Sequence, residues 1–280
     1  MTLKNIFLTI DFESLFLIEN FKNIDTSSYQ TKNRLSFQLD QILNFLKKND
    51  ILSTFFVLKK DAAKNPHLIR KIHSYGHEIA SHGSSHKLLY ELSVSSMDSD
   101  IFDSKRFLED TIQSEIYGYR APCFSFREKL IPILEKYKFR YDSSYNCSSF
   151  NNRYSSHKFN NFSFDPFLIE NSNIVEFPLS NIILYKNLNF PISGGGMGRL
   201  TPRKIWFYLC KKYLKDNKNL IFYLHPWEID NQLPIIFSSP KKMFATYYNT
   251  SNFLNKFQFL IDNLNAKYNT NWMRMKEFEI

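Results

Sequence analysis

Short apolar runs alternate with longer stretches of helical periodicity along this chain, and this alternation limits the possible folds more than any other feature of the sequence. Strands that alternate with helices form βα units around a largely parallel sheet. The seven runs predicted as strands are residues 6–10, 54–57, 78–81, 118–120, 140–142, 174–178 and 220–224. The predicted helices are residues 34–48, 62–73, 95–111, 128–137, 202–214 and 251–264, the fifth with Thr201 as its N-cap. We therefore predict an α/β fold.

The predicted elements form a single domain. No linker, sequence repeat or low-complexity block divides residues 1–280. We expect a core of about residues 5–230 and a C-terminal helical extension of about residues 245–280. Residues 145–173, rich in Ser, Asn and Phe, are predicted to form a long loop over one face of the domain.

The composition is that of a folded, soluble chain. Of its 280 residues, 43% are hydrophobic and 22% are charged, which supplies a sizeable core and excludes disorder as the main state. No apolar run approaches the roughly 18 residues of a membrane-spanning helix, and the first strand begins too early to leave room for a signal peptide. Cys123, Cys147 and Cys210 form no C-x-x-C pair, which argues against a disulfide frame or a cysteine zinc site. We therefore expect a cytoplasmic protein.

The excess of basic residues indicates a charged surface. The chain has 36 Lys and Arg against 27 Asp and Glu, a net charge of +9, but the basic residues occur as scattered pairs such as Lys47-Lys48 and Lys211-Lys212. A nucleic-acid-binding domain is therefore a less favoured interpretation, because it rests on net charge alone. A basic face could instead lie against an anionic membrane or bind a phosphorylated substrate.

Side chains that can bind metals or transfer protons cluster where the predicted strands end. This is the edge at which parallel α/β folds carry their active sites. The first strand runs into Asp11-Phe12-Glu13, two acids separated by one residue. At this position one carboxylate could act as a base and the other as a metal ligand. The alternative is that Asp11 is a local cap and Glu13 is a solvated loop acid.

Two histidines follow the third predicted strand at a spacing typical of zinc sites. His82 and His86 are four residues apart, and on one helical turn residues at i and i+4 share a face, so both imidazoles could reach one cation. Two unrelated surface histidines are the alternative, because no H-E-x-x-H glutamate accompanies them. We interpret His73 and His77 as structural.

Two other strand ends carry an arginine and a histidine. Arg120 precedes Ala121-Pro122 and can hold a carboxylate bidentately and keep it ionised, although a pair with a surface acid would also explain it. His225 ends the last strand at an aromatic rim. An imidazole that titrates near neutral pH is suited to protonate a leaving amine, whereas a lone histidine is more often structural.

Four of the seven glycines in the chain lie close together, at positions 194, 195, 196 and 198. Glycine adopts backbone conformations that other residues avoid, so this run predicts a tight loop. The loop could bring backbone amides near a substrate, or it could be a purely structural turn.

Six motifs occur in order along residues 5–230. They are Asp11-Phe12-Glu13, His82-x-x-x-His86, Arg120-Ala121-Pro122, Tyr141-Asp142-Ser143-Ser144, Gly194-Gly195-Gly196 and Leu224-His225-Pro226-Trp227-Glu228. This combination resembles the polysaccharide deacetylases of the NodB-homology superfamily (carbohydrate esterase family 4), and most closely the branch found with bacterial exopolysaccharide and O-antigen genes. The resemblance implies a distorted (β/α)7 barrel, which agrees with the seven predicted strands.

The resemblance implies a base and a metal triad. Asp11 would be the general base, kept charged by Arg120, and Glu13, His82 and His86 would bind a divalent metal, zinc by default. The ion would lower the pKa of a water molecule and polarise the acetyl carbonyl. The family's first motif has two adjacent aspartates followed by glycine, whereas this chain has Asp11-Phe12-Glu13-Ser14. Which of Asp11 and Glu13 binds the metal therefore stays open.

The resemblance also implies residues for the leaving group and the oxyanion. His225 would protonate the departing amine, and Asp142 is placed near the acid that tunes this histidine in the family. The backbone N–H of Cys123 would be an oxyanion donor, without a role for its thiol.

These roles describe a metal-dependent hydrolase that removes N-acetyl groups from an amino sugar in a bacterial surface polysaccharide or its precursor. We expect as partner an N-acetylated glycan or a nucleotide-linked or lipid-linked precursor, with peripheral membrane proximity in the lipid-linked case, and no nucleic acid. The sequence identifies no protein partner. A cyclic amide or imide hydrolase on the same barrel stays an alternative. A non-catalytic carbohydrate-binding protein is less favoured, because binding alone would not need a base, a metal triad and an acid together.

Overall fold

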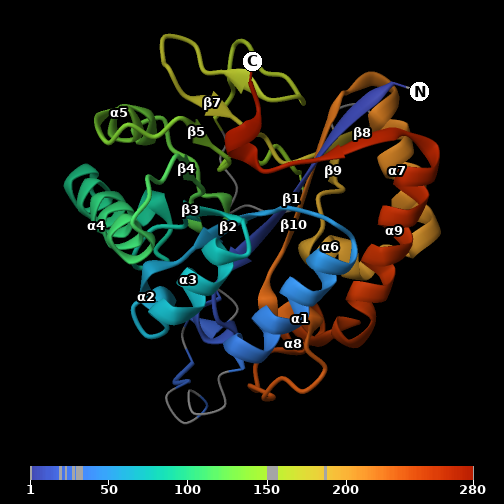
Figure 1. Ribbon diagram of the computed structural model, residues 1–280, viewed down its shortest axis with the longest axis horizontal. Coiled ribbons are helices and arrows are strands. Elements are labelled where there is room, and N and C mark those ends of the chain that lie inside the picture. The colour runs from blue at the N-terminus through green and yellow to red at the C-terminus, as the bar shows by residue number, and fades with distance from the viewer. Residues whose placement is uncertain are drawn as a thin grey trace.

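A ten-residue strand, β1 (Leu3–Phe12), organises the sheet in the computed structural model of this chain (Figure 1). It pairs in parallel with β10 (Asn219–Leu224) on one side and with β2 (Thr54–Val57) on the other. The structure describes residues 2–18, 21–22, 24–26, 29, 34–149, 157–185 and 188–279.

All seven predicted strands are present, and they form one parallel path in the order β10-β1-β2-β3-β4-β5-β7. Antiparallel β6 extends this path within the predicted loop 145–173, of which residues 150–156 lie outside the described residues. The strands not yet given bounds are β3 (Glu78–Ser81), β4 (Gly118–Tyr119), β5 (Tyr141–Asp142), β6 (Phe167–Leu168) and β7 (Val175–Glu176). The prediction of an α/β fold is confirmed.

The sheet is curled. Phe7 on β1 and Phe177 just after β7 lie on strands separated by four others, yet their ring centroids are 5.4 Å apart. This contact requires the path to bend round on itself, as in the predicted distorted (β/α)7 barrel.

Helices surround the outside of the curled sheet (Figure 1). Their bounds are α1 (Leu35–Lys48), α2 (Lys59–Ala62), α3 (Pro66–Ser74), α4 (Val94–Ile112), α5 (Leu130–Lys136), α6 (Gly195–Leu200), α7 (Arg203–Asp216), α8 (Pro240–Tyr247) and α9 (Phe253–Lys267). The helix predicted over residues 62–73 is present as α3, but its predicted start is wrong, because α2 ends at Ala62 and Pro66 begins α3. Proline cannot continue a helix through its own position but is well suited to the first turn.

The glycine run begins a helix that the sequence analysis did not predict. Gly194 has φ of +117° and lies against β10, where an added Cβ would come within 2.4 Å of the Tyr223 carbonyl oxygen. Helix α6 starts at the next residue. Thr201 ends α6 by donating its hydroxyl to the Met197 carbonyl, so the prediction of Thr201 as the N-cap of α7 was wrong, and Pro202 takes that place. The run is a close-packed turn against the sheet.

Besides β6, three further strands in the described part of the chain lie outside the predicted set. β8 (Asn181–Tyr185) and β9 (Leu188–Pro191) form a hairpin, and β11 (Asn269–Trp272) pairs in parallel with the first residues of β1. The stretch predicted as a helical extension, residues 245–280, therefore contains the end of α8 and all of α9 and also adds a strand to the sheet. Figure 1 shows this red segment crossing from α9 toward β7.

The C-terminal segment covers the amino-terminal end of the strands. The Met275 N–H donates to the Thr54 hydroxyl at the start of β2. The buried Met275 side chain joins the cluster inside the curl, which consists of Phe7, Phe56, Ala80, Phe124, Tyr141, Phe177, Leu179, Ile221 and Met275. Phe278 packs against Phe7 and Phe177, with ring centroids 5.8 and 5.5 Å away. The opposite, carboxyl end of the strands is where the predicted site residues emerge.

Side chains alternate between the two faces of the strands, as extended chains require. On β1, Leu8 packs with Ile6 and Ile10 toward the helices, whereas Phe7 belongs to the cluster inside the curl. The same period of two directs Asp11 inward. It explains why a strand of apolar residues ends with a carboxylate in the interior.

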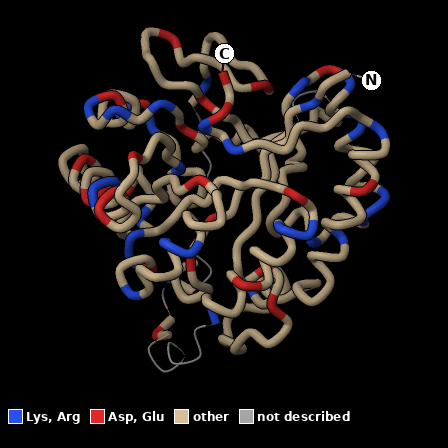
Figure 2. Tube along the Cα trace, in the orientation of Figure 1, with Lys and Arg blue, Asp and Glu red and all other residues tan. Residues whose placement is uncertain are grey.

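Charged residues are spread over the molecule. Figure 2 shows Lys and Arg on helices and loops on all sides of the view, intermingled with Asp and Glu. None of the helices in the described part of the chain combines the length and apolarity that a membrane span requires.

Candidate active site

A buried ion pair connects β1 with the residue that follows β4. Arg120 Nη1 donates to Asp11 Oδ1 over 2.7 Å and to the Thr9 hydroxyl over 2.8 Å. Arg120 Nη2 donates to the Ser143 hydroxyl over 2.8 Å, and the guanidinium lies over the Phe56 ring at 3.9 Å from its centroid. Arg120 and Asp11 are 0% and 2% exposed, so the pair is formed away from solvent. A guanidinium in this position holds the Asp11 carboxylate in place.

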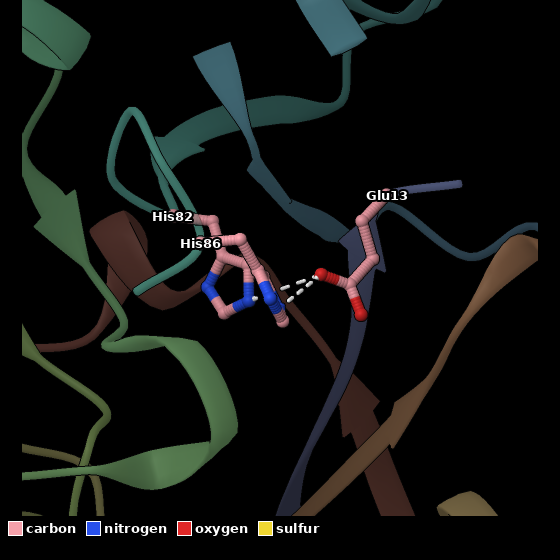
Figure 3. Close-up of side chains that lie close together, drawn as sticks. All are labelled: Glu13, His82 and His86. Atoms are coloured by element: carbon pink, nitrogen blue, oxygen red, sulfur yellow. Dashed lines mark ion pairs between the residues drawn. The ribbon is translucent and has the colours of Figure 1, made fainter. Parts of the chain in front are cut away.

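Glu13, His82 and His86 form a cluster beside this pair. One ligand atom from each lies within 4.8 Å of the others, and all three residues are buried. Glu13 Oε2 is 2.6 Å from His86 Nε2 and 3.8 Å from His82 Nε2. Figure 3 shows both imidazoles directed toward the Glu13 carboxylate, which comes from the segment after β1.

The two histidines meet without a helix. His82 follows β3 directly, and residues 83–86 form a loop in which His86 has φ of +60°. The Asp100 carboxylate on α4 accepts the N–H groups of Ser84 and Ser85 at 2.7 and 3.0 Å, which anchors this loop. The expectation that one helical turn would align the imidazoles is therefore wrong, although the spacing did identify two residues that meet.

The donor set of this cluster fits a divalent metal. His82 Nδ1 lies 2.8 Å from the Arg120 carbonyl oxygen, which only accepts, so the Nε2 lone pair of a neutral His82 is left for a cation. Glu13 Oε2 is buried between the two imidazoles. Burial alone would raise the pKa of Glu13, but the surrounding histidines, His86 foremost, lower it to about 2. One carboxylate and two imidazoles are typical ligands of zinc and related ions.

His225 lies on the other side of the acids and is held by a second ion-pair chain. Its Nε2 is 3.5 Å from Glu13 Oε1 and 3.9 Å from Asp11 Oδ2. Its Nδ1 is 2.9 Å from Glu228 Oε2, and Glu228 Oε1 accepts Arg199 Nε at 2.8 Å. Burial opposes the charged imidazole, but the Glu228 carboxylate and then the other acids raise the pKa of His225 to about 9.

The sequence analysis named Glu228 within a motif without giving it a role, and it did not single out Arg199. Glu228 did carry a local signal, because an acid three residues after His225 can accept the backbone N–H of that residue, as it does here at 2.9 Å. No local sequence signal pointed to Arg199, because it lies on α6, 29 residues from Glu228. It also donates to the carbonyls of Ala245 and Tyr248, which ties α8 to the site.

The structure does not bring Asp142 to His225. Tyr141 points into the curl, where its ring packs on Phe177, so the alternation of β5 directs Asp142 to the opposite face of the sheet. There it accepts the Ser144 hydroxyl at 2.5 Å and faces Glu176, its partner in register on β7. Burial raises the pKa of Asp142 to about 6. The carboxylate bound to the imidazole is that of Glu228.

Cys123 lies in a tight turn after Arg120. Cys123 and Phe124 both have positive φ, +52° and +55°, which reverses the chain beside the ion pair. The Cys123 side chain is half-buried there. A tight turn of this kind can present a backbone N–H to a ligand. The role of the Cys123 N–H as an oxyanion donor stays a prediction.

Comparison with known proteins gives two matches that together cover most of the chain. The polysaccharide deacetylase family model matches residues 30–141, and a domain of unknown function, DUF3473, matches residues 143–278. These matches support the polysaccharide deacetylase family. The deacetylase match contains His82, His86 and Arg120, and the second match contains His225 and Glu228. The exopolysaccharide branch is a finer assignment that these matches do not reach.

Individual relatives agree with the deacetylase family. A peptidoglycan-N-acetylglucosamine deacetylase of Bacillus cereus is 29% identical over 82 residues, 29% of this chain and 38% of that protein. The chain thus spans under two-fifths of the length of the curated relatives it matches.

Solved structures share the fold. A putative polysaccharide deacetylase from Mycobacterium smegmatis has a TM-score of 0.60 at 17% identity, covering 98% of this chain and 87% of that one. PuuE allantoinase has a TM-score of 0.63 at 16% identity with the same coverage. Pseudoenzymes of carbohydrate esterase family 4 are also among the similar structures. At these identities the likeness concerns the fold alone.

Proposed function

We propose that this protein is a metal-dependent hydrolase that removes the N-acetyl group from an amino sugar of a bacterial surface polysaccharide or its precursor. The observation that carries the proposal is the convergence of a buried, arginine-held Asp11 with the Glu13–His82–His86 cluster and with His225. A carbohydrate-binding protein would need none of these groups in contact. The name of the Bacillus cereus relative supports an N-acetylated glycan as the substrate.

Asp11 is suited to act as the base. Arg120 occupies its Oδ1, which leaves Oδ2 on the side of His225 and the cluster. The carboxylate is buried at the carboxyl end of β1, where it would accept the proton of a water molecule that attacks the acetamide carbonyl. The C–N bond then breaks to give acetate and an amine.

His225 is suited to protonate the amine. Its pKa of about 9 keeps the imidazole protonated at neutral pH, and Glu228 fixes the ring through Nδ1 so that Nε2 faces the reacting centre. Fixing the ring in advance avoids the entropy of ordering it during the reaction.

Glu13, His82 and His86 would bind the metal, with zinc as the expected ion. Such an ion, when bound, supplies Lewis-acid chemistry that polarises a carbonyl and acidifies water. The groups that orient the ligands are in place, because the Arg120 carbonyl orients His82 and Asp100 anchors the loop of His86.

The test is acetate release from chitin oligosaccharides by metal-loaded wild type and by Asp11→Asn, which leaves the size of the side chain unchanged. We expect release by the wild type and a loss of at least about 100-fold in the variant, the lower range for a general base. The same preparations are assayed for ring opening of allantoin. Hydrolysis of allantoin without acetate release would favour the cyclic amide alternative, and neither activity in a metal-loaded protein would favour a pseudoenzyme.

A further inference from the structure

A cavity of about 550 Å³ opens beside the metal cluster. Ser14 and His86 line it, so it begins where the Glu13–His82–His86 cluster ends. One of its walls is apolar and consists of Phe16, Leu17, Phe21 and Ile24. A ligand in this cavity would be adjacent to the reacting centre.

Four lysines and one aspartate line the same cavity: Lys22, Lys60, Lys64, Lys87 and Asp61. Lys22 pairs with Glu91 at 2.7 Å. The other three lysines, Lys60, Lys64 and Lys87, form no ion pair with an acid in the described part of the chain. The neighbouring Lys59, by contrast, is directed toward Asp103 at 3.9 Å. Three exposed ammonium groups are thus available around one concave surface.

The aspartate can offset only one of the four lysine charges. Asp61 is 2% exposed, and its Oδ2 accepts the Ser14 N–H at 2.7 Å, which makes it part of the wall. Burial raises the pKa of Asp61, and the nearby Lys64 opposes this shift. Clefts lined by one sign of charge concentrate oppositely charged ligands, and the lysine ammonium is a common phosphate-binding group.

We propose that this lysine cavity binds the phosphate of a phosphate-linked N-acetyl sugar. The inference rests on the proposed function, because it assigns to that reaction a substrate class: a sugar whose acetamide lies at the metal cluster and whose phosphate lies among Lys60, Lys64 and Lys87. A neutral polysaccharide has no group that would use these charges. The apolar wall receives whatever the phosphate carries beyond it, a nucleoside or a prenyl chain.

The first experiment measures binding without catalysis. Inorganic pyrophosphate is titrated calorimetrically into the full chain after chelation and dialysis, so that no metal competes for the probe. The Lys60→Gln, Lys64→Gln, Lys87→Gln variant is compared with Lys211→Gln, Lys212→Gln, Lys215→Gln, which removes the same charge from α7. Helices α2 and α7 lie on opposite sides of the molecule in Figure 1.

We expect the wild type and the α7 variant to bind pyrophosphate with affinities within about twofold, and the cavity variant to bind at least about tenfold more weakly. Absence of binding to the wild type would overturn the proposal. An equal loss in the two triple variants would also overturn it, because it would show attraction to net charge alone. None of the substituted lysines is buried, and thermal unfolding of each variant verifies that it folds.

The second experiment compares substrates in the metal-loaded enzyme at low salt. We expect kcat/KM for UDP-N-acetylglucosamine to exceed that for N,N′-diacetylchitobiose, and the cavity variant to lose at least about tenfold on the first substrate only. Equal values on both substrates in the wild type would contradict the proposal. Absence of acetate from every sugar would instead contradict the proposed function, and pyrophosphate binding would then decide the cavity separately.

A third arm distinguishes the sources of the phosphate. UDP-N-acetylglucosamine is compared with N-acetylglucosamine linked through pyrophosphate to a short prenyl chain. The substrate with the higher kcat/KM identifies whether a nucleoside or a lipid occupies the apolar wall.

Discussion

Arg120 reaches across the inside of the curled sheet to Asp11, 109 residues earlier in the chain, and the two side chains meet at 2.7 Å with almost no exposure to solvent. Asp11 lies on β1 and Arg120 directly follows β4, and these two strands are separated in the sheet by β2 and β3. The contact exists because the sheet curls, so the placement of the Asp11 carboxylate depends on the fold as a whole.

Breaking this pair should affect both stability and activity. Arg120→Met leaves a buried carboxylate without its partner, and we expect the free energy of unfolding to fall by about 3–5 kcal/mol. Urea denaturation measures this change. The Asp11→Asn, Arg120→Met double variant removes both charges and should recover part of the stability but none of the acetate release. Recovery of activity in the double variant would contradict the role of Asp11 as base.

Metal content tests the cluster directly. We expect about one divalent ion per wild-type chain and almost none in His82→Ala, His86→Ala, since two of the three ligands are lost. His67→Ala, His73→Ala on α3 is the matched control and should retain the metal. Zinc at roughly a hundredfold excess over its Kd should stabilise the wild type by about 2.7 kcal/mol and leave the cluster variant unchanged. A wild type that takes up no zinc, cobalt or manganese would overturn the metal-dependent mechanism.

Glu228 and Arg199 should act through His225. Glu228→Gln removes the carboxylate that orients the imidazole, and we expect kcat to fall by about 10–100-fold, as for other groups that orient a reacting side chain, with little change in KM. Arg199→Met leaves Glu228 buried without its guanidinium and should in addition lower the free energy of unfolding by about 3 kcal/mol. Arg203→Met, on the exposed side of α7, is the control. A kcat unchanged in Glu228→Gln would show that this ion-pair chain has no part in positioning the histidine.

His77 should make stability depend on pH. Its buried Nδ1 accepts the Ser53 N–H, and burial, with a smaller effect of Arg274, lowers the pKa of His77 from its ordinary value of 6.5 to about 4. Between these values the unfolded chain binds the proton and the folded chain does not, so stability falls as the pH drops from 6.5 to 4. The total loss is about 3 kcal/mol. Urea unfolding at about pH 7.5 and pH 5 should show most of this loss in the wild type and a smaller one in His77→Gln.

The C-terminal segment should contribute to the stability of the sheet. Met275 is 1% exposed and lies in the cluster inside the curl, so Met275→Ala should lower the free energy of unfolding by about 2–5 kcal/mol. Met273→Ala, at a half-buried position of the same segment, should have a smaller effect. Equal effects of the two substitutions would show that the segment does not fill the amino-terminal end of the barrel.

Local patterns in the sequence account for the strands and for the identity of most candidate residues. Apolar runs such as residues 6–10 have few conformations that bury them other than a strand in a parallel sheet, and all seven predicted strands are present. The period of two then places Asp11 on the same face as Phe7, whatever the rest of the chain does.

Contacts between distant segments account for what the sequence analysis missed. The loop of His86 is held by Asp100 on α4, and Glu228 is held by Arg199 on α6. Asp142 follows the same alternation as its neighbours, but which of the two faces of β5 is interior depends on how the sheet curls.

Side-chain chemistry and periodicities within a few residues are local properties, and they were enough to specify the strands, the polar residues at their ends and the residue types available for a base, a metal site and an acid. Which of these residues meet is a property of the folded chain. Whether Arg120 reaches Asp11, whether Glu228 or Asp142 contacts His225, and whether four lysines border one cavity depend on the curl of the sheet and on loops anchored by residues far away in the chain. No local pattern encodes those distances.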